Sequence, residues 1–186
     1  MRLVEQHEVV ETWLRMELDK ESKGTVDLGE QEVLDEYGAL TQLLVQKPNC
    51  GQVFVEYELQ WCSVTLTEAQ FRRLRTIWGD ELPVMEHAQK LLDGSSDLEE
   101  DRKAHIREFA EQPADAVGRL ILNRRRRPGV GPLVQDGNHR AVGIALRMLR
   151  GEQYRAMAAY IGYPSLDCFG WTGRARARWH AYRGTL

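Results

Sequence analysis

Cysteine is scarce in this 186-residue chain, which contains only Cys50, Cys62 and Cys168. The three residues are widely spaced, are odd in number and form no CxxC pair. Such a set suggests neither a disulfide framework nor a zinc site. We therefore expect all three to be free thiols.

Long hydrophobic runs are also missing. No apolar stretch approaches the roughly 18 residues that a membrane-spanning helix needs. Near the N-terminus, Glu5, Glu8 and Glu11 interrupt the segment in which a secretion signal would carry an unbroken apolar core. With 42% hydrophobic and 28% charged residues, the composition is typical of a globular protein. These features predict a cytoplasmic protein that does not enter a membrane.

Charge is unevenly distributed, although the formal net charge is only -3. Residues 1–100 hold 21 Asp and Glu against 9 Lys and Arg, a balance of -12. Residues 101–186 hold 7 against 16, a balance of +9. The basic half could face nucleotide phosphates, a nucleic acid backbone or the acidic half of the same chain.

The first half of the chain shows mainly helical spacing of apolar residues. Helices are predicted over residues 3–19 and 30–46, and one long strand or a bent pair over residues 52–66. Thr67 and Gln70 form a capping box that opens a further helix, predicted to run to Gly79. A short helix is expected at residues 84–92.

The second half mixes helices and strands. A helix capped by Ser95 or Ser96 is predicted to run towards Gln112, and residues 114–123 are expected to start as helix and end as strand. Residues 132–135 predict a short strand, followed by a helix that extends to Arg150. The spacing at residues 154–161 fits strand or helix, and a basic helix is expected near the C-terminus.

The strand and helix at residues 132–150 enclose Asp136, Gly137, Asn138, His139 and Arg140. A helix N-terminus offers unpaired backbone N–H groups and about half a positive charge, and a glycine there lets an anion approach closely. Arg140, Asn138 and His139 can add hydrogen bonds to phosphate oxygens. Asp136 can cap the helix or help to hold a metal ion. The segment therefore predicts a phosphate-binding site.

The string DGNHRAVGIA resembles the phosphate-binding motif of the ParB/sulfiredoxin superfamily, and the free serine kinases have the most similar version. The resemblance covers roughly residues 121–163. It implies that Gly137, Asn138, His139 and Arg140 contact the phosphates of ATP, ADP or CTP. It also implies that Asp136 orients the loop or a magnesium ion, which makes Asp136 and His139 candidate catalytic residues.

Departures from the motif narrow the choice of superfamily members. Sulfiredoxins need a cysteine directly before the His-Arg pair, and Asn138 stands there. Partition proteins carry a helix-turn-helix and a dimerisation tail after the motif, for which the 46 residues after Arg140 leave little room. Free serine kinases use an upstream glutamate as the base, and by spacing the resemblance implies this role for Glu100 or its neighbour Glu99.

Charged residues outside the motif suggest further contacts. A run of four arginines precedes the motif strand and could contact a nucleotide or a nucleic acid, although such a run is ordinarily a solvated turn. The run comprises Arg124, Arg125, Arg126 and Arg127. Three other residues lack a ligand-spaced partner and are interpreted as ordinary surface or core side chains: His7, His87 and His105.

Together these features predict an α+β fold with a small mixed sheet. Residues 1–96 are expected to form an acidic, largely helical portion, and residues 97–186 a basic, ParB/sulfiredoxin-like portion, unless both form one compact domain. The predicted function is nucleotide binding with phosphoryl transfer or hydrolysis, aided by magnesium. The alternatives are a nucleic-acid-binding or nuclease-like protein and a non-catalytic interaction module. Neither the phosphoryl acceptor nor the oligomeric state follows from the sequence.

Overall fold

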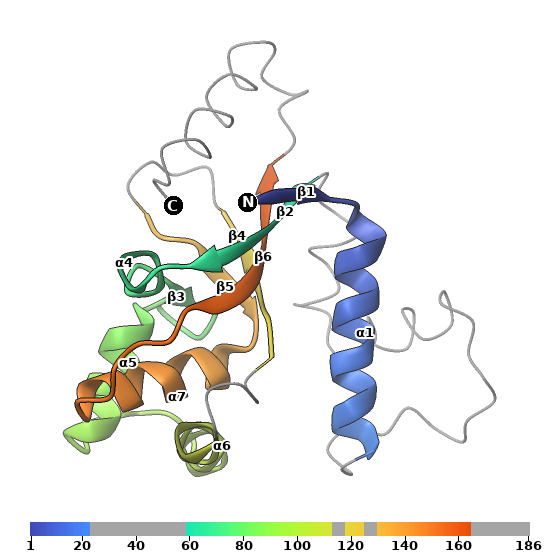
Figure 1. Ribbon diagram of the computed structural model, residues 1–186. Coiled ribbons are helices and arrows are strands. Elements are labelled where there is room, and N and C mark those ends of the chain that lie inside the picture. The colour runs from blue at the N-terminus through green and yellow to red at the C-terminus, as the bar shows by residue number, and fades with distance from the viewer. Residues whose placement is uncertain (23–58, 113–117, 125–129, 165–186) are drawn as a thin grey trace.

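The computed structural model describes residues 1–22, 59–112, 118–124 and 130–164 (Figure 1). These residues form five helices and a six-stranded mixed sheet, so the predicted α+β class is confirmed. The elements in chain order are β1 (Arg2–Val4), α1 (Gln6–Ser22), β2 (Leu59–Leu66), α4 (Glu68–Phe71), β3 (Arg75–Thr76), α5 (Val84–Leu92), α6 (Glu100–Glu111), β4 (Leu120–Asn123), β5 (Leu133–Asp136), α7 (Asn138–Leu149) and β6 (Met157–Pro164).

The sheet has the strand order β1-β2-β6-β4-β5-β3. Strands β4 and β6 pair in parallel, as do β3 and β5, and the other three pairs are antiparallel. Strands β1 to β3 come from the acidic half of the sequence and β4 to β6 from the basic half. Backbone pairing therefore joins the two halves in one sheet.

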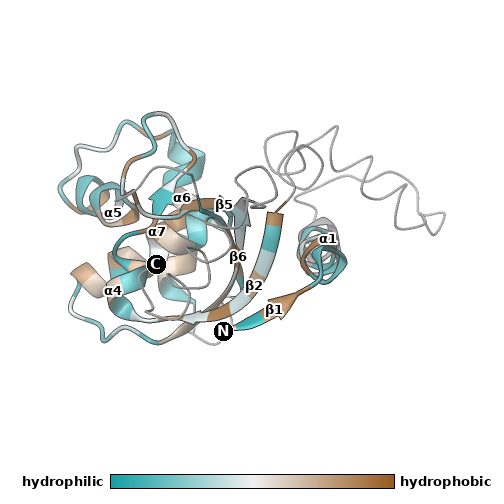
Figure 2. Ribbon diagram, turned by 90° about the horizontal axis from the view of Figure 1, so that it is seen from above, coloured by the Kyte–Doolittle hydropathy of each residue, from teal (hydrophilic) through white to brown (hydrophobic). Residues whose placement is uncertain are grey.

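Helices cover both faces of this sheet (Figure 2). On one face, Trp13 of α1 packs in a small apolar cluster with Trp61, Ile121 and Tyr160. On the other face, α5, α6 and α7 cover a larger cluster that includes residues of β2, β4, β5 and β6. Because apolar side chains alternate between the faces of each strand, β4 contributes to both clusters.

Helix α7 is the central helix of the larger layer and contacts both α5 and α6. A Cβ atom added at Gly143 would lie 2.9 Å from both the Ile106 carbonyl oxygen and the Phe109 Cβ. The absence of a side chain at this position therefore lets α6 approach the backbone of α7. This close packing joins the middle of α7 to the second half of α6.

Local signals in the sequence located several elements correctly. The expected helix at residues 84–92 is α5, and the helix expected to end before Pro113 is α6. The motif strand and helix are β5 and α7, and the capping box of Thr67 and Gln70 is present. The undecided segment at residues 154–161 contributes to strand β6, which pairs with both β2 and β4.

Other predictions were wrong. The helix predicted from Thr67 to Gly79 stops at Phe71, because residues 75–76 instead pair in parallel with β5 as strand β3. Leu3 belongs to strand β1 and not to the first helix, because it pairs with β2. Helix α6 begins after Glu99, and neither Ser95 nor Ser96 caps it.

Some expectations lie outside the described residues. They are the helix at residues 30–46, the first part of the strand at residues 52–66, the helical start of residues 114–123, the C-terminal basic helix, and Cys50 and Cys168. Cys62 is a buried free thiol, as expected. In the part of the chain that the structure describes, no helix has both the length and the apolar character needed to cross a bilayer.

Candidate functional site

A single residue in the left-handed conformation, Gly137, connects strand β5 to the start of α7. Its φ is 91° and its ψ is 25°, a conformation that glycine adopts without steric cost. A Cβ atom at this position would lie 2.6 Å from Leu120 Cδ2. The first α-helical bond runs from the Ala141 N–H to the Gly137 carbonyl at 2.8 Å, and Gly137, the N-cap residue, has no side chain with which to cap the helix. The expected strand, glycine turn and helix are therefore present.

Asn138 fastens the start of α7 to the turn that follows β3. Its side chain is buried, and its Oδ1 accepts a hydrogen bond from the Ile77 N–H at 3.2 Å. The side-chain amide oxygen of Asn138 is therefore hydrogen-bonded within the protein. This bond positions the Ile77 to Leu82 turn beside the motif, an arrangement that the residue spacing did not reveal.

Arg140 is buried, and its guanidinium contacts other parts of the protein. Its Nη1 donates a hydrogen bond to the Arg119 carbonyl at 2.7 Å, and its Nη2 lies 3.7 Å from Asp136 Oδ2. The guanidinium carbon also lies 5.9 Å from the centre of the Phe109 ring. These contacts hold the motif loop against the segment that leads into β4. A direct contact between Arg140 and phosphate stays a prediction.

Asp136, the candidate metal ligand, is buried beside the Arg140 guanidinium. Within the described ranges, no group of three or more His, Cys, Asp or Glu residues is arranged to hold a metal ion. A carboxylate that faces a buried guanidinium is poorly suited to bind a second cation, since the two positive charges would compete for the same oxygens. The described residues therefore do not fit a resident metal at Asp136.

His139 lies in a cluster of aromatic, imidazole and guanidinium groups beside the first turn of α7. Its ring centre is 4.9 Å from the Trp78 ring and 5.6 Å from the His105 ring. Trp78 also contacts His87 edge-on at 5.4 Å, and the Arg102 guanidinium carbon lies 5.8 Å from its ring centre. We call this group the Trp78 cluster. It gathers residues from the turn after β3, from α5, from α6 and from α7.

The Trp78 cluster is the part of the site that sequence reasoning missed. The sequence predicts His87 and His105 to be ordinary surface or core side chains, yet both contact aromatic partners within this cluster. The spacing of Arg102 and His105, three apart on α6, was the one available signal, because such residues share a helix face. The other members, Trp78 and His87, lie far from the motif in the sequence, so no local pattern connects them with it.

His87 is the buried member of the cluster. Its Nε2 lies 2.9 Å from the Thr76 hydroxyl, and its Nδ1 has no hydrogen-bond partner among the described residues. Burial lowers the pKa of His87 below its ordinary value, and Lys90 adds to this effect. The imidazole is therefore neutral at physiological pH and serves as a packing partner for Trp78.

Glu100, the candidate catalytic base, is exposed at the start of α6. Its carboxylate accepts a hydrogen bond from Lys103 at 2.8 Å, and this bond lowers the pKa of Glu100. A lower pKa makes a carboxylate a weaker base. No hydrogen bond or ion pair joins Glu100 to residues 136–140 in the described parts of the chain. The geometry thus offers no support for Glu100 as the base, whereas His139 lies within the site.

Arg124 lies at the other end of the sheet from the motif. Strands β4 and β5 are antiparallel, with Asn123 opposite Leu133, so Arg124 follows the end at which β5 begins. The motif follows the end at which β5 stops, and four residues of strand span roughly 13 Å. Burial lowers the pKa of Arg124, and nearby Arg73 adds to this effect. Arg125, Arg126 and Arg127 lie outside the described residues.

No protein-family model matches this chain, and comparisons with curated proteins and with solved structures return no match. The resemblance to the ParB/sulfiredoxin superfamily therefore rests on the motif residues alone.

Proposed function

We propose that this chain is a ParB/sulfiredoxin-like protein that binds a nucleoside phosphate such as ATP, ADP or CTP at the start of α7. The observation that carries the proposal is the N-terminus of a 12-residue helix, reached directly from a buried strand through Gly137, an N-cap residue that has no side chain to occupy the backbone N–H groups. Backbone N–H groups and the helix dipole favour an anion at such a position.

The side chains around the helix start support the same proposal. His139 and His105 can donate hydrogen bonds to phosphate oxygens. Arg102 of α6 lies 3.6 Å from the exposed Glu99 carboxylate through its Nε, and its other guanidinium nitrogens can add positive charge. The first turn of α7 contains no acidic residue. An acidic side chain there would compete with a bound anion. In this proposal, Asn138 and Arg140 hold the loop, and His139 contacts the phosphates.

The proposed reaction is transfer or hydrolysis of a phosphoryl group. Such reactions depend mainly on positioned phosphates, neutralising charge and one group that accepts a proton. His139 is our candidate for that group, because imidazole is the most common proton acceptor in catalysis and this ring lies beside the first turn of α7. Magnesium commonly binds proteins through substrate phosphates, so in this proposal it arrives with the nucleotide.

Nucleotide-dependent stabilisation tests the proposal. ATP, ADP, CTP, GTP and tripolyphosphate, each with and without magnesium, are added in a thermal unfolding assay. A ligand at one hundred times its Kd adds about 2.7 kcal/mol to the free energy of unfolding, which raises Tm by roughly 5–10 °C for a protein of this size. We expect His139→Ala and Arg102→Gln to weaken binding at least about tenfold.

The matched control is Arg150→Gln. Arg150 is an exposed arginine at the other end of α7, where it pairs with Glu111 at 2.9 Å. The Arg150→Gln variant should leave nucleotide binding unchanged. The proposal fails if no nucleotide raises Tm, or if His139→Ala binds nucleotide as the wild type does. If an oligonucleotide protects the protein instead, with a steep dependence on salt, the nucleic-acid-binding alternative replaces it.

A further inference from the structure

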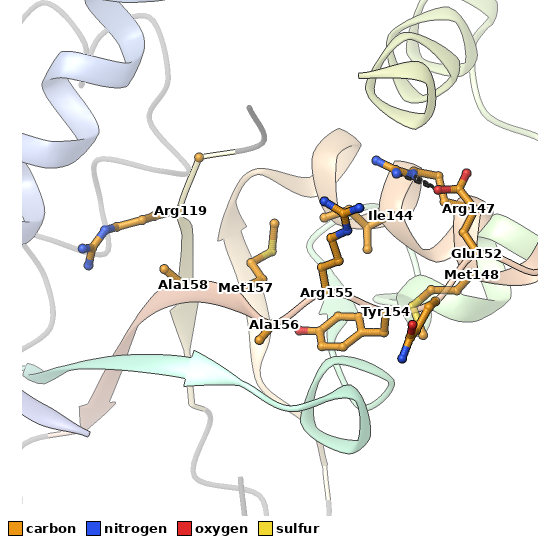
Figure 3. A pocket seen from close by; sticks show the side chains of 12 residues that line it. Arg119, Ile144, Arg147, Met148, Glu152, Tyr154, Arg155, Ala156, Met157 and Ala158 are labelled. Atoms are coloured by element: carbon orange, nitrogen blue, oxygen red, sulfur yellow. Dashed lines mark hydrogen bonds and ion pairs between the residues drawn. The ribbon is translucent and has the colours of Figure 1, made fainter. Parts of the chain in front are cut away.

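A cavity of about 290 Å³ lies beside the second half of α7, away from the motif. Its walls come from α7, from the Glu152–Ala156 segment, from the start of β6 and from residues 118–119 (Figure 3). None of residues 136–140 lines it. The cavity is therefore lined by residues other than those of the motif, and the two regions meet where Arg140 donates to the Arg119 carbonyl.

One part of the wall is apolar. Ile144, Met148, Tyr154 and Met157 contribute side chains to it. The Tyr154 hydroxyl donates to the Leu66 carbonyl at 3.0 Å, so its polar atom is used by the protein. Methionine side chains adapt their shape to what they contact. This part of the wall suits a flexible apolar group.

The charged part of the wall leaves one guanidinium available. Arg147 donates to Glu152 Oε2 at 2.6 and 2.9 Å and to the Gln112 carbonyl at 2.7 Å. The bond from Arg147 lowers the pKa of Glu152, so this pair is ionised and balanced. Arg155 forms no hydrogen bond or ion pair with any described residue, and its side chain is exposed.

Arg119 is the third arginine of the wall, and its guanidinium contacts residues outside the cavity. Arg119 Nη1 donates to the Ser63 hydroxyl at 3.2 Å, and its guanidinium lies 4.9 Å from the centre of the Tyr160 ring. Figure 3 shows Arg119 directed away from the cavity, towards α1, whereas Arg155 is directed towards the helix that carries Ile144. Glu152 lies close enough to Arg155 to attract its charge, but Glu152 already accepts two bonds from Arg147. Next to an apolar wall, the cavity thus offers the Arg155 guanidinium in excess of its one carboxylate.

We propose that this cavity binds a small amphipathic carboxylate, with its charged group on Arg155 and its apolar chain against Ile144, Met148 and Met157. One guanidinium in excess of the Arg147–Glu152 pair matches a monoanion, and a carboxylate fits the paired N–H groups of Arg155. A water molecule occupies about 30 Å³ in the liquid, so the cavity volume corresponds to a ligand of about ten non-hydrogen atoms.

Methionine methyl NMR tests this proposal with hexanoate as the probe. The full chain is labelled with ¹³C at its methionine methyl groups, of which Met148 and Met157 line the cavity, while Met1 and Met85 do not and serve as internal references. We expect hexanoate to shift the Met148 and Met157 signals to saturation. Hexanamide lacks the charge and acetate lacks the chain, so both should bind at least about tenfold more weakly.

Variants of Arg155 identify the charge contact. Arg155→Gln should weaken hexanoate binding about tenfold, and Arg155→Lys should recover part of the loss, since lysine keeps the charge without the paired geometry. Arg107→Gln, at an exposed arginine of α6 outside the cavity, should have no effect. The proposal is overturned if hexanoate leaves Met148 and Met157 unshifted, if hexanamide or acetate binds equally well, or if Arg155→Gln binds as the wild type does.

Discussion

Buried polar side chains hold the start of α7 in place. Asn138 accepts a bond from the Ile77 N–H, and Arg140 links the Arg119 carbonyl to Asp136. A buried polar group that loses its partner costs about 1–3 kcal/mol. Replacing Arg140 by alanine would therefore lower stability whether or not Arg140 contacts phosphate. For this reason, His139 and Arg102 are the better residues for testing the site.

His87 should make stability depend on pH. Its pKa is lowered in the folded protein, so the folded state binds a proton less readily than the unfolded state does. Above the ordinary pKa of 6.5 both states are neutral and the effect is absent. As the pH falls below 6.5, the unfolded state gains the proton first, and the free energy of unfolding decreases.

Urea unfolding at pH 7.5, 6.5 and 5.5 measures this effect. Each unit of difference between the two pKa values lowers the free energy of unfolding by about 1.4 kcal/mol at low pH. His87→Gln has no titrating ring and should show a smaller decrease between pH 6.5 and pH 5.5. Parallel pH profiles for the two proteins would show that another group causes the decrease.

Helices α6 and α7 meet where Gly143 removes a side chain. Alanine is the better helix former by about 1 kcal/mol, but a Cβ atom here would lie 2.9 Å from the Ile106 carbonyl and from Phe109 Cβ. Overpacking of this kind typically costs about 1–3 kcal/mol. Because the nearest atoms belong to a helix backbone and a Cβ, they cannot move aside cheaply.

We therefore expect Gly143→Ala to destabilise the protein by about 1–2 kcal/mol, measured by urea unfolding at pH 7.5. Arg107→Ala is the control, because Arg107 is exposed on α6 and its replacement should change stability by less than about 0.5 kcal/mol. A stabilised Gly143→Ala protein would mean that α6 and α7 are further apart than described.

The sheet unites the acidic and basic halves of the chain. Strand β2 pairs with β6 along all eight of its residues, from Leu59 opposite Pro164 to Leu66 opposite Met157. Strand β6 in turn pairs with β4. Opening either half would break this central ladder and expose both apolar clusters, so the two halves should not unfold independently.

Native-state hydrogen exchange tests whether the two halves unfold together. Amide protons in the centres of β2 and β6 should exchange with the same opening free energy, and both values should decrease with urea at the same slope. Amides near the exposed N-terminal end of β1 should exchange faster and act as the reference for local fraying. Two distinct opening energies for β2 and β6 would indicate two folding units.

Local patterns were sufficient to predict α5, α6, the Thr67 capping box and the passage from β5 through Gly137 into α7. In each case the determining interaction lies within a few residues: an apolar spacing, a cap, or a backbone conformation that only glycine adopts easily. The sequence alone thus located the motif and the structural context that a phosphate site requires.

Only the tertiary structure decided how the side chains around that motif are used. It made residues 75–76 a strand, buried Arg140 against Arg119, joined His87 and His105 through Trp78 and His139, and placed Arg124 at the far end of the sheet. These outcomes depend on pairing between segments that are far apart in sequence. A short-range pattern carries no information about such contacts, because packing between elements determines which polar groups face one another.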